Sequence, residues 1–359
     1  MNYEKQPLHI TTPVPNGTYE VTVTITAHED ITFTIYAQSR RVMVQNHTMK
    51  GGEKKDFTFD VSVCDTNKRD FGYAKMEGVE IDIACDGDFT AVSMVSPVDI
   101  PTVFIAGDST VTDQPAEYPY SPSSTYCGWG QMFPQLLKGG IAVENQAQSG
   151  SATSDFIEIN FTAFKDRIKK DDFLIIEFGH NDQKIKELGA FTGYTENLRY
   201  LVNFAREKGA TPIICSPINR ILFQEDGTLL NLLGDYRNAV KKVCEEMDVP
   251  FIDLWTRTTE FFERAGAVKA WDYFWSNGTD RDYTHTNDIG GGIIARFVAQ
   301  EMVKAGVEPI ASLIKRDMTD VTMPIPDPNA KPMNSKEIEH IKTIGLVNAP
   351  DIDRDITKI

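Results

Sequence analysis

A serine at the end of an apolar run is the first residue whose position suggests chemistry. Residues 102–106 form the short run Thr-Val-Phe-Ile-Ala, and Gly107-Asp108-Ser109 follows directly. A serine at a strand-to-helix turn presents its hydroxyl at the edge of a sheet, with its backbone N–H facing the same cavity. A Gly-Asp-Ser tripeptide alone is more often a helix N-cap, so Ser109 needs partners elsewhere in the chain before it can be called a nucleophile.

A base that could activate this serine lies far along the chain. Asp282 and His285 stand three residues apart in Arg-Asp-Tyr-Thr-His, just before the glycine-rich start of a helical pattern. Histidine titrates near neutral pH, which suits the activation of a serine hydroxyl. A carboxylate on the second ring nitrogen would fix the tautomer of the histidine. One local turn can hold both groups, although a lone Asp-x-x-His is more often a surface turn.

Two further segments offer hydrogen-bond donors for the negative charge that develops during acyl transfer. Residues 178–182, Phe-Gly-His-Asn-Asp, follow a second apolar run, and the amide of Asn181 can point into the same crevice. Gly150 lies in the loop 145–151, where a glycine lets a backbone N–H approach a substrate oxygen closely. Each segment taken singly is equally typical of a plain polar turn.

The elements that must position these residues alternate between strand and helix. Apolar strands are predicted at 102–106, 173–178, 212–215 and 249–254, with helical stripes between them. This alternation indicates an α/β fold with a doubly wound parallel sheet, expected over residues 101–314. Ligands of such sheets bind at the carboxyl ends of the strands, and Ser109 and Asn181 lie just after two such ends.

The N-terminal and C-terminal segments have other patterns. Apolar and polar residues alternate at 19–25, 31–35, 57–63 and 79–83, with turn residues between these runs. Such alternation is typical of antiparallel strands, and we expect a small jelly-roll-like β-sandwich over residues 1–98. Residues 315–359 are rich in proline and lose periodicity, which predicts an extended C-terminal tail.

The composition and charge of the chain exclude several classes of binding partner and indicate where the protein is located. The 359 residues carry a net charge of −16, which argues against nucleic acid and against a membrane surface as the main partner. The N-terminus shows no signal peptide, and no apolar run reaches the roughly 18 residues of a membrane span. The five scattered cysteines include no Cys-x-x-Cys pair, which favours reduced thiols over a disulfide framework or a zinc site. We therefore expect a cytoplasmic protein.

The four segments, in this order and each at a predicted strand end, resemble the blocks of the SGNH (GDSL-type) hydrolase superfamily. Those blocks correspond here to Gly107-Asp108-Ser109, Gly150, Gly179-His180-Asn181-Asp182, and Asp282 with His285. Within the superfamily, the strings at 104–114, 128–132, 177–184 and 282–285 are similar to rhamnogalacturonan acetylesterases, the type of carbohydrate esterase family 12. The resemblance covers about residues 101–304 and implies a flavodoxin-like, three-layer α/β/α fold.

The resemblance also implies a role for each of these residues. Ser109 attacks the acetyl carbonyl, His285 accepts its proton, and Asp282 orients His285. The backbone N–H groups of Ser109 and Gly150 and the side chain of Asn181 form the oxyanion hole. No metal and no cofactor is expected.

The expected substrate is an acetylated oligosaccharide from plant cell walls, of the pectic (rhamnogalacturonan) or the xylan kind. Relatives commonly have Arg-Ser after the glycine of the second block, whereas Ser151-Ala152 follow it here. If that arginine grips an acidic sugar, its absence puts the pectic substrate in doubt more than it does the chemistry. The missing export signal favours short, imported oligosaccharides over polymer.

Several other residues allow two interpretations. Trp129, Trp271 and Trp275 can stack on sugar rings or fill the core, since both uses suit a large flat side chain. Arg220, after the third strand of the α/β part, can contact the substrate or form a structural ion pair. His180 is a rival base, but a structural role beneath its loop is favoured.

Two alternatives to an acetylesterase remain open. A lipase-like or thioesterase-like member of the same superfamily would use an extended apolar acyl channel, and nothing in the sequence indicates one. A carbohydrate-binding protein with an inactive hydrolase domain is disfavoured by the complete Ser/Asp/His/Asn set. The N-terminal domain is expected to shape the cleft or to form a homodimer rather than to bind sugar independently.

Overall fold

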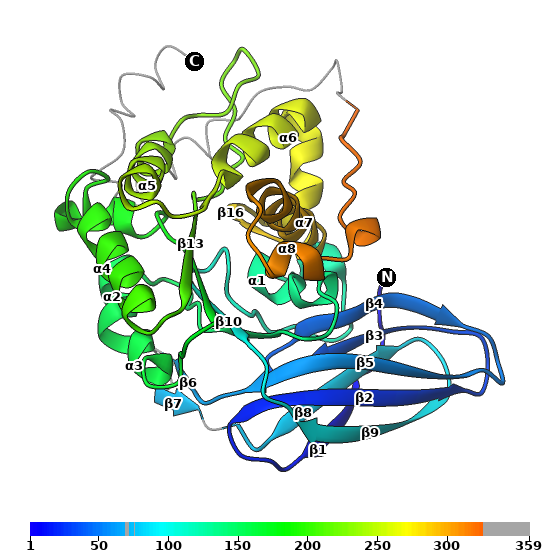
Figure 1. Cartoon of the computed structure of the whole chain (residues 1–359). Helices are drawn as coiled ribbons and strands as arrows, with labels where there is room; N and C mark the ends of the chain where they lie inside the picture. The colour runs from blue at the N-terminus through cyan, green and yellow to red at the C-terminus, as the bar shows by residue number, and fades with distance from the viewer. Residues whose placement is uncertain (69–71, 75, 326–359) are drawn as a thin grey trace.

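The computed structural model describes residues 1–68, 72–74 and 76–325, with side chains placed outside 66–75. Two β-sheets from the first hundred residues pack beside a larger part in which helices cover a parallel sheet (Figure 1). Of the tail predicted at 315–359, only residues 315–325 lie in these ranges, so most of that prediction falls outside the described residues.

The N-terminal part consists of two antiparallel sheets and a short hairpin. The sheets have the strand orders β1-β8-β3-β4 and β5-β2-β9. The strands are β1 (Leu8–Thr12), β2 (Gly17–Ala27), β3 (Ile31–Ala37), β4 (Arg41–Met49), β5 (Lys54–Val63), β8 (Val79–Cys85) and β9 (Phe89–Pro97), and the hairpin pairs β6 (Thr66–Lys68) with β7 (Gly72–Ala74). Side chains at alternate positions of the two sheets form one apolar core, as the period-two pattern requires. The four runs predicted as strands lie within β2, β3, β5 and β8.

The larger part is built on a five-stranded parallel sheet, which confirms the predicted α/β class. Its strand order is β11-β10-β12-β13-β14, and all neighbours are parallel. The strands are β10 (Thr102–Gly107), β11 (Ala142–Asn145), β12 (Phe173–Glu177), β13 (Thr211–Cys215) and β14 (Phe251–Ile252). The strand β11 is an addition to the four strands predicted from the sequence.

Helices cover both faces of this sheet (Figure 1). One face carries α2 (Thr153–Asp155), α3 (Phe161–Phe164), α4 (Gly193–Glu207) and α5 (Gly234–Met247). The other carries α1 (Trp129–Met132), α6 (Leu254–Lys269), α7 (Asp288–Ala305) and α8 (Ile310–Leu313). A π-helical turn, η3 (Phe156–Asn160), joins α2 to α3. Short 3-10 turns are η1 (Pro122–Ser124), η2 (Pro134–Leu136), η4 (Asp182–Lys184), η5 (Lys186–Leu188), η6 (Ala270–Tyr273) and η7 (Arg316–Met318).

A two-stranded hairpin precedes α7 and carries one end of the predicted site. It pairs β15 (Phe274–Ser276) with β16 (Arg281–Thr286). The next residue, Asn287, caps α7, because its side-chain oxygen accepts hydrogen bonds from the backbone N–H groups of Ile289 and Gly290, at 3.0 Å each. The helix ends at Gly306, whose φ of 67° is the left-handed conformation typical of a C-terminal cap. The cap and the hairpin together fix where β16 ends.

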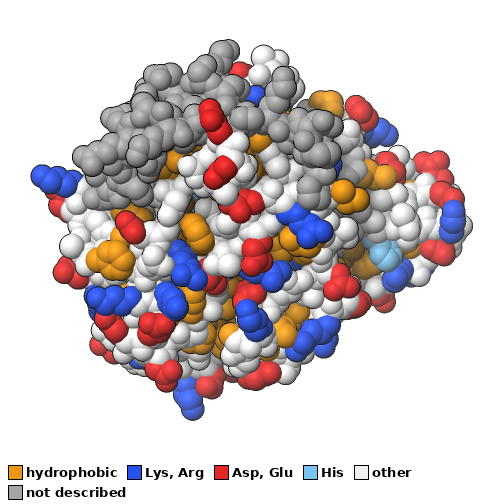
Figure 2. Space-filling view, turned by 90° about the horizontal axis from the view of Figure 1, so that it is seen from above, with side chains coloured by type: hydrophobic (Ala, Val, Ile, Leu, Met, Phe, Trp, Pro, Cys, Tyr) orange, Lys and Arg blue, Asp and Glu red, His pale blue; other side chains and the backbone are white. Residues whose placement is uncertain are grey.

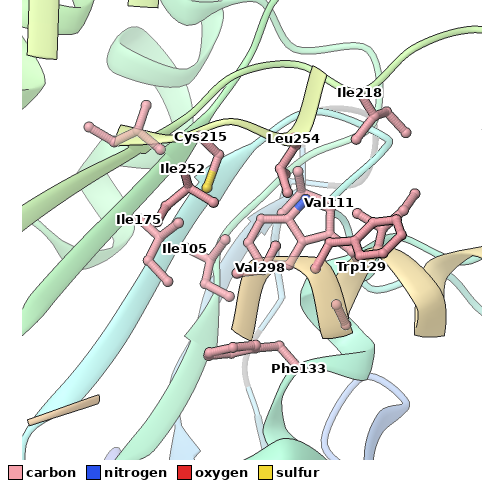
Figure 3. Close-up of a cluster of buried hydrophobic side chains, with 14 of the residues drawn as sticks. Ile105, Val111, Trp129, Phe133, Ile175, Cys215, Ile218, Ile252, Leu254 and Val298 are labelled. Carbon is pink, nitrogen blue, oxygen red and sulfur yellow. The ribbon is translucent and has the colours of Figure 1, made fainter. Parts of the chain in front are cut away.

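The apolar core of the α/β part fills both faces of the sheet, against α3, α4 and α5 on one side and against α1, α6 and α7 on the other. Figure 3 shows Trp129 and Phe133 among Val111, Leu254 and Val298, next to strand residues of β10, β12, β13 and β14. On the surface, acidic and basic side chains are interspersed over the face in Figure 2. Within the described ranges, no helix combines the length and the apolar character that crossing a bilayer demands.

Candidate active site

Ser109, His285 and Asp282 form a continuous chain of hydrogen bonds. Ser109 Oγ lies 2.7 Å from His285 Nε2, and His285 Nδ1 lies 2.7 Å from Asp282 Oδ2. The other carboxylate oxygen, Asp282 Oδ1, accepts hydrogen bonds from the backbone N–H groups of Thr284 (2.7 Å) and His285 (3.0 Å). The predicted three-residue turn therefore exists, and it holds the carboxylate and the imidazole in one fixed orientation.

The nucleophile candidate sits on a tight turn after β10. Asp108 Oδ1 accepts hydrogen bonds from the Thr110 backbone N–H (2.9 Å) and from its hydroxyl (2.8 Å). A Cβ at Gly107 would lie 2.7 Å from Val111 Cγ2, so only glycine fits this close approach. No α-helix starts at this turn; apart from the 3-10 turn η1, the chain is irregular until α1 begins at Trp129.

The acid–base environment suits a carboxylate that supports the histidine. Burial alone would raise the pKa of Asp282, but the hydrogen bond and charge of His285 and the two backbone N–H groups outweigh it and lower that pKa. Asp282 is therefore ionised at neutral pH. An ionised Asp282 accepts a hydrogen bond from the Nδ1–H of His285, which keeps the proton on Nδ1 and leaves Nε2 as an acceptor facing Ser109.

Asn181 and Gly150, the other predicted oxyanion donors, line the same pocket as Ser109. One amide hydrogen of Asn181 is directed to the Ser151 carbonyl oxygen, 3.1 Å from Nδ2, and Lys184 Nζ donates to Asn181 Oδ1 at 2.9 Å. These two contacts set the rotation of the amide. Gly150 has a φ of 79°, a conformation that favours glycine.

The pocket around Ser109 is lined mainly by residues whose side chains carry polar or charged groups. Its lining consists of Ser109, Gln114, Tyr126, Ser149, Gly150, His180, Asn181, Lys184, Arg220, Trp275, Arg281, Asp282, Tyr283, Thr284 and His285. The rings of Tyr126 and Trp275 are stacked, with centroids 4.7 Å apart, and the Tyr126 ring meets His285 edge-on. Burial and the neighbouring Asp282 carboxylate raise the pKa of Tyr126 to about 12, so its hydroxyl stays protonated.

Buried ionisable groups stand at and just after the end of β12, and one of them, His180, also lines the pocket. Burial raises the pKa of Glu177 to about 8 and that of Asp182 to about 7. Burial lowers the pKa of His180 to about 4, and its Nδ1 lies 3.6 Å from Asp108 Oδ2. His180 is thus a poor proton acceptor at neutral pH. Ser109 instead meets His285, which agrees with a structural role for His180.

The three tryptophans considered as possible substrate contacts have different positions in the structure. The prediction is wrong for Trp129, which has no exposed surface and whose Nε1–H donates to Glu177 Oε2 at 2.5 Å. Trp271 does not belong to the pocket lining, and its ring lies under the Arg281 guanidinium, 4.3 Å from the centroid. A contact of Trp271 with substrate stays a prediction. Trp275 lines the pocket.

Arg220 lines the pocket but is itself buried. It donates hydrogen bonds to Thr284 Oγ1 (3.2 Å), Gln183 Oε1 (3.1 Å) and the His180 carbonyl oxygen (3.4 Å). These acceptors are neutral, and among the residues the structure describes no carboxylate forms an ion pair with Arg220, so the structural ion pair is not realised, while a contact of Arg220 with substrate stays a prediction. Arg220 thereby ties the loop after β12 to the strand β16.

Sequence reasoning missed several residues of the pocket. Lys184 stands two residues after the third block and ends the string 177–184, and that position was the one signal available. Gln114 ends the string 104–114 but was assigned no role, whereas Tyr126 and Arg281 carry no motif of their own and enter the pocket through the fold. In the described part of the chain, no cluster of three or more His, Cys, Asp or Glu side chains could hold a metal ion.

Comparisons with known proteins agree with this geometry. A family model for the GDSL-like Lipase/Acylhydrolase family matches residues 105–292. The chain is 34% identical to rhamnogalacturonan acetylesterase RhgT of Bacillus subtilis over 60% of its own length and 95% of that protein. It is also 34% identical to the probable rhamnogalacturonan acetylesterase YesY of Bacillus subtilis, over 59% of its own length and 97% of that protein.

A solved structure resembles the chain over a longer span. Protein YxiM of Bacillus subtilis superposes with a TM-score of 0.53 at 24% identity, covering 84% of this chain and 80% of that one. This likeness concerns the fold alone. The sheet, the site and the named relatives together define a carboxylic ester hydrolase. The chain belongs to the GDSL-like lipase/acylhydrolase family, the SGNH hydrolases.

Proposed function

We propose that this chain is a serine carbohydrate O-acetylesterase that removes acetyl groups from plant cell-wall oligosaccharides of the pectic or xylan kind. The observation that carries the proposal is the chain of two 2.7 Å hydrogen bonds from Ser109 through His285 to Asp282 at the wall of a polar pocket. The names of the 34% identical relatives support acetyl groups on rhamnogalacturonan as the substrate.

In the first half-reaction the ester is split. Ser109 Oγ attacks the acetyl carbonyl carbon while His285 Nε2 takes the hydroxyl proton, and Asp282 stabilises the imidazolium that forms. The carbonyl oxygen becomes an oxyanion, held by the backbone N–H groups of Ser109 and Gly150 and by the amide of Asn181. The C–O bond to the sugar then breaks, and the sugar hydroxyl leaves with the proton from His285.

In the second half-reaction the acetyl-enzyme is hydrolysed. His285 Nε2 takes a proton from water, whose oxygen attacks the acetyl carbon on Ser109. The same donors hold the second oxyanion, and its collapse returns the proton to Ser109 Oγ and releases acetate. No step requires an oxidant, a reductant or a group from outside the chain other than water.

The charges of the pocket favour an acidic sugar. Lys184, Arg220 and Arg281 line it, against a single carboxylate, Asp282. A local excess of positive charge in a chain of net charge −16 acts within about one Debye length of roughly 10 Å. A uronate carboxylate would therefore be attracted here. Lys184 supplies a cation near the site even though Ser151 replaces the arginine commonly found in relatives.

The pocket also favours a short acyl group. A long acyl chain needs an apolar channel, whereas most of the side chains that surround Ser109 here are polar or charged. The stacked pair of Tyr126 and Trp275 offers a flat apolar surface of the kind on which sugar rings stack. A cytoplasmic location, short imported oligosaccharides and a homodimer remain parts of this proposal, tested by cell fractionation and by the mass of the protein in solution.

The substrate is tested by measuring acetate release from acetylated pectic and acetylated xylan oligosaccharides and by hydrolysis of p-nitrophenyl acetate and octanoate. We expect kcat/KM to be higher for the acetate than for the octanoate ester, and higher for pectic than for xylan fragments. A preference for the octanoate would contradict the acetylesterase proposal and favour the lipase-like alternative. Binding of the oligosaccharides without any acetate release would favour a carbohydrate-binding protein.

A further inference from the structure

An arginine of the N-terminal part reaches into the α/β part beside the active-site loops. Arg40 stands in the turn between β3 and β4 and is 8% exposed, and its φ of 67° is uncommon for a residue other than glycine. The strand β4 that follows lies against α1 (Figure 1). Tyr36 and Val42, on either side of this turn, belong to the core of the α/β part rather than to that of the β-sheets.

The guanidinium of Arg40 joins three segments of the α/β part. It forms a bidentate ion pair with Asp288, with Nη1 and Nη2 each 2.9 Å from a carboxylate oxygen. Nε donates to the Gln114 carbonyl oxygen at 2.7 Å, and Nη2 donates to the Tyr126 carbonyl oxygen at 3.0 Å. A planar fork with several fixed donors suits such multiple contacts better than an ammonium group does.

Each of these three segments carries a part of the active site. Asp288 begins α7 three residues after His285. The backbone of Tyr126 bridges to Asn287, and its ring meets His285 edge-on, with ring centroids 5.9 Å apart. On the other side of the pocket, Gln114 Nε2 donates to the carbonyl oxygen of Ser109 (3.3 Å) and to Ser149 Oγ (3.0 Å). Arg40 therefore contacts segments next to the nucleophile and next to the histidine.

The neighbouring arginine strengthens the same junction. Arg41, 3% exposed, donates from Nε to Asp113 Oδ2 at 2.9 Å and from Nη1 to the Val143 carbonyl oxygen at 2.6 Å. Asp113 Oδ1 in turn accepts a hydrogen bond from Asn145 Nδ2 at 2.8 Å. Two consecutive arginines thus pair with two buried aspartates that lie in the segment after Ser109 and in the helix after His285.

Resting on the proposed function, we infer that Arg40 is a positioning residue for the esterase reaction, and that the N-terminal part completes the active site through it. Arg40 does not touch the reacting atoms. It holds the Tyr126 and Asp288 segments, both of which adjoin His285, together with the Gln114 segment beside Ser109. Displacement of these segments by about 1 Å would misalign Ser109 and His285, and such shifts cost about 100-fold in rate.

The test uses the full chain and a double variant, Arg40→Met with Asp288→Asn, which removes both buried charges and leaves neither unpaired. We expect kcat on p-nitrophenyl acetate to fall about 100-fold while KM changes by no more than about threefold, because alignment and not binding is lost. The labelling of Ser109 by a fluorophosphonate should slow in parallel. Arg40→Lys, which keeps the charge without the fork, should fall between wild type and the double variant.

The matched control is Asp60→Ala, which removes another contact between the two parts. Asp60 Oδ2 accepts a hydrogen bond from the Gly140 backbone N–H at 2.6 Å, outside the active-site loops. This variant should keep wild-type kcat and labelling, which separates loss of interface contacts from loss of alignment. Circular dichroism and thermal melting establish that each variant is folded.

A folded double variant with wild-type kcat and labelling would overturn the inference. If the double variant does not fold, Arg40→Lys decides, and a folded Arg40→Lys protein with wild-type kcat overturns it equally. Wild-type protein that neither hydrolyses the ester nor reacts with the fluorophosphonate would instead refute the proposed function, and the positioning role would fall with it.

Discussion

Replacing Asp282 with asparagine tests how Asp282 controls the tautomer of His285, because the hydrogen bonds around Asp282 determine which way the new amide must face. Asp282 Oδ1 accepts two backbone N–H groups, and Oδ2 accepts from His285 Nδ1. If the amide oxygen of the Asp282→Asn side chain keeps the two backbone donors, its NH₂ group faces Nδ1 and donates to it. The imidazole then carries its proton on Nε2, which can no longer take the proton of Ser109.

The opposite orientation of the amide is unfavourable. It would place the NH₂ group against two N–H donors and lose two hydrogen bonds of about 1 kcal/mol each. The wrong tautomer should therefore prevail, and kcat should fall by about 10⁴, the typical cost of this change in a serine triad.

The assay is p-nitrophenyl acetate hydrolysis by the Asp282→Asn variant under saturating substrate. The control is Asp280→Asn, the same chemical change at an exposed position of the same hairpin, which should keep wild-type kcat. A folded Asp282→Asn protein whose kcat stays within about tenfold of wild type would refute the tautomer argument.

Four other outcomes are expected. Asn181→Ala should lower kcat by about 10²–10³ with little change in KM, because the amide acts on the transition state; a change in KM alone, in the same ester assay, would contradict this. Trp275→Ala should raise KM for acetylated oligosaccharides more than for p-nitrophenyl acetate, since the indole lines the pocket; equal effects on both substrates would argue against stacking. Asp253→Ala should lower the free energy of unfolding in urea by about 1–2 kcal/mol at unchanged kcat, because this carboxylate caps α6 through the Thr256 N–H and also pairs with Arg237. The free energy of unfolding should fall as pH rises from about 4.5 to about 8, because native Glu177 keeps a proton that the unfolded chain releases; Glu177→Gln should flatten this slope in urea titrations, and an unchanged slope would contradict the assignment.

Much of the site could be predicted because parallel sheets collect the ends of their strands at one edge. Ser109 follows β10 and Asn181 follows β12, its neighbour in the sheet, so two apolar runs with polar ends indicated the geometry. The pair of Asp282 and His285 was predictable from their three-residue spacing, which one turn can close. The positions of these residues follow from short local sequence patterns, and such patterns can be recognised in a single sequence.

The missed elements have physical reasons. The strand β11 was not predicted because Ala142–Asn145 is short and contains Glu144, whose side chain is fully buried and paired with Arg167. Because a charged residue interrupts the apolar residues of this strand, its sequence does not show the continuous apolar run that is typical of a buried strand. Trp129 was wrongly predicted to contact substrate. Its indole N–H donates a hydrogen bond to the buried Glu177, and the local sequence does not indicate that the side chain points into the core. Arg40 acts across the junction with the α/β part and carries no motif.

The central claim, that Ser109 is the nucleophile of an acetylesterase, is tested most directly by acetate release from acetylated pectic oligosaccharides, comparing the wild-type chain with Ser109→Ala and with Ser123→Ala. Ser123 is an exposed serine in η1, outside the pocket lining, and its variant serves as the matched control. We predict that Ser109→Ala lowers the rate by several orders of magnitude, up to about 10⁶, while Ser123→Ala keeps the wild-type rate. A folded Ser109→Ala protein that releases acetate as fast as wild type would contradict the claim.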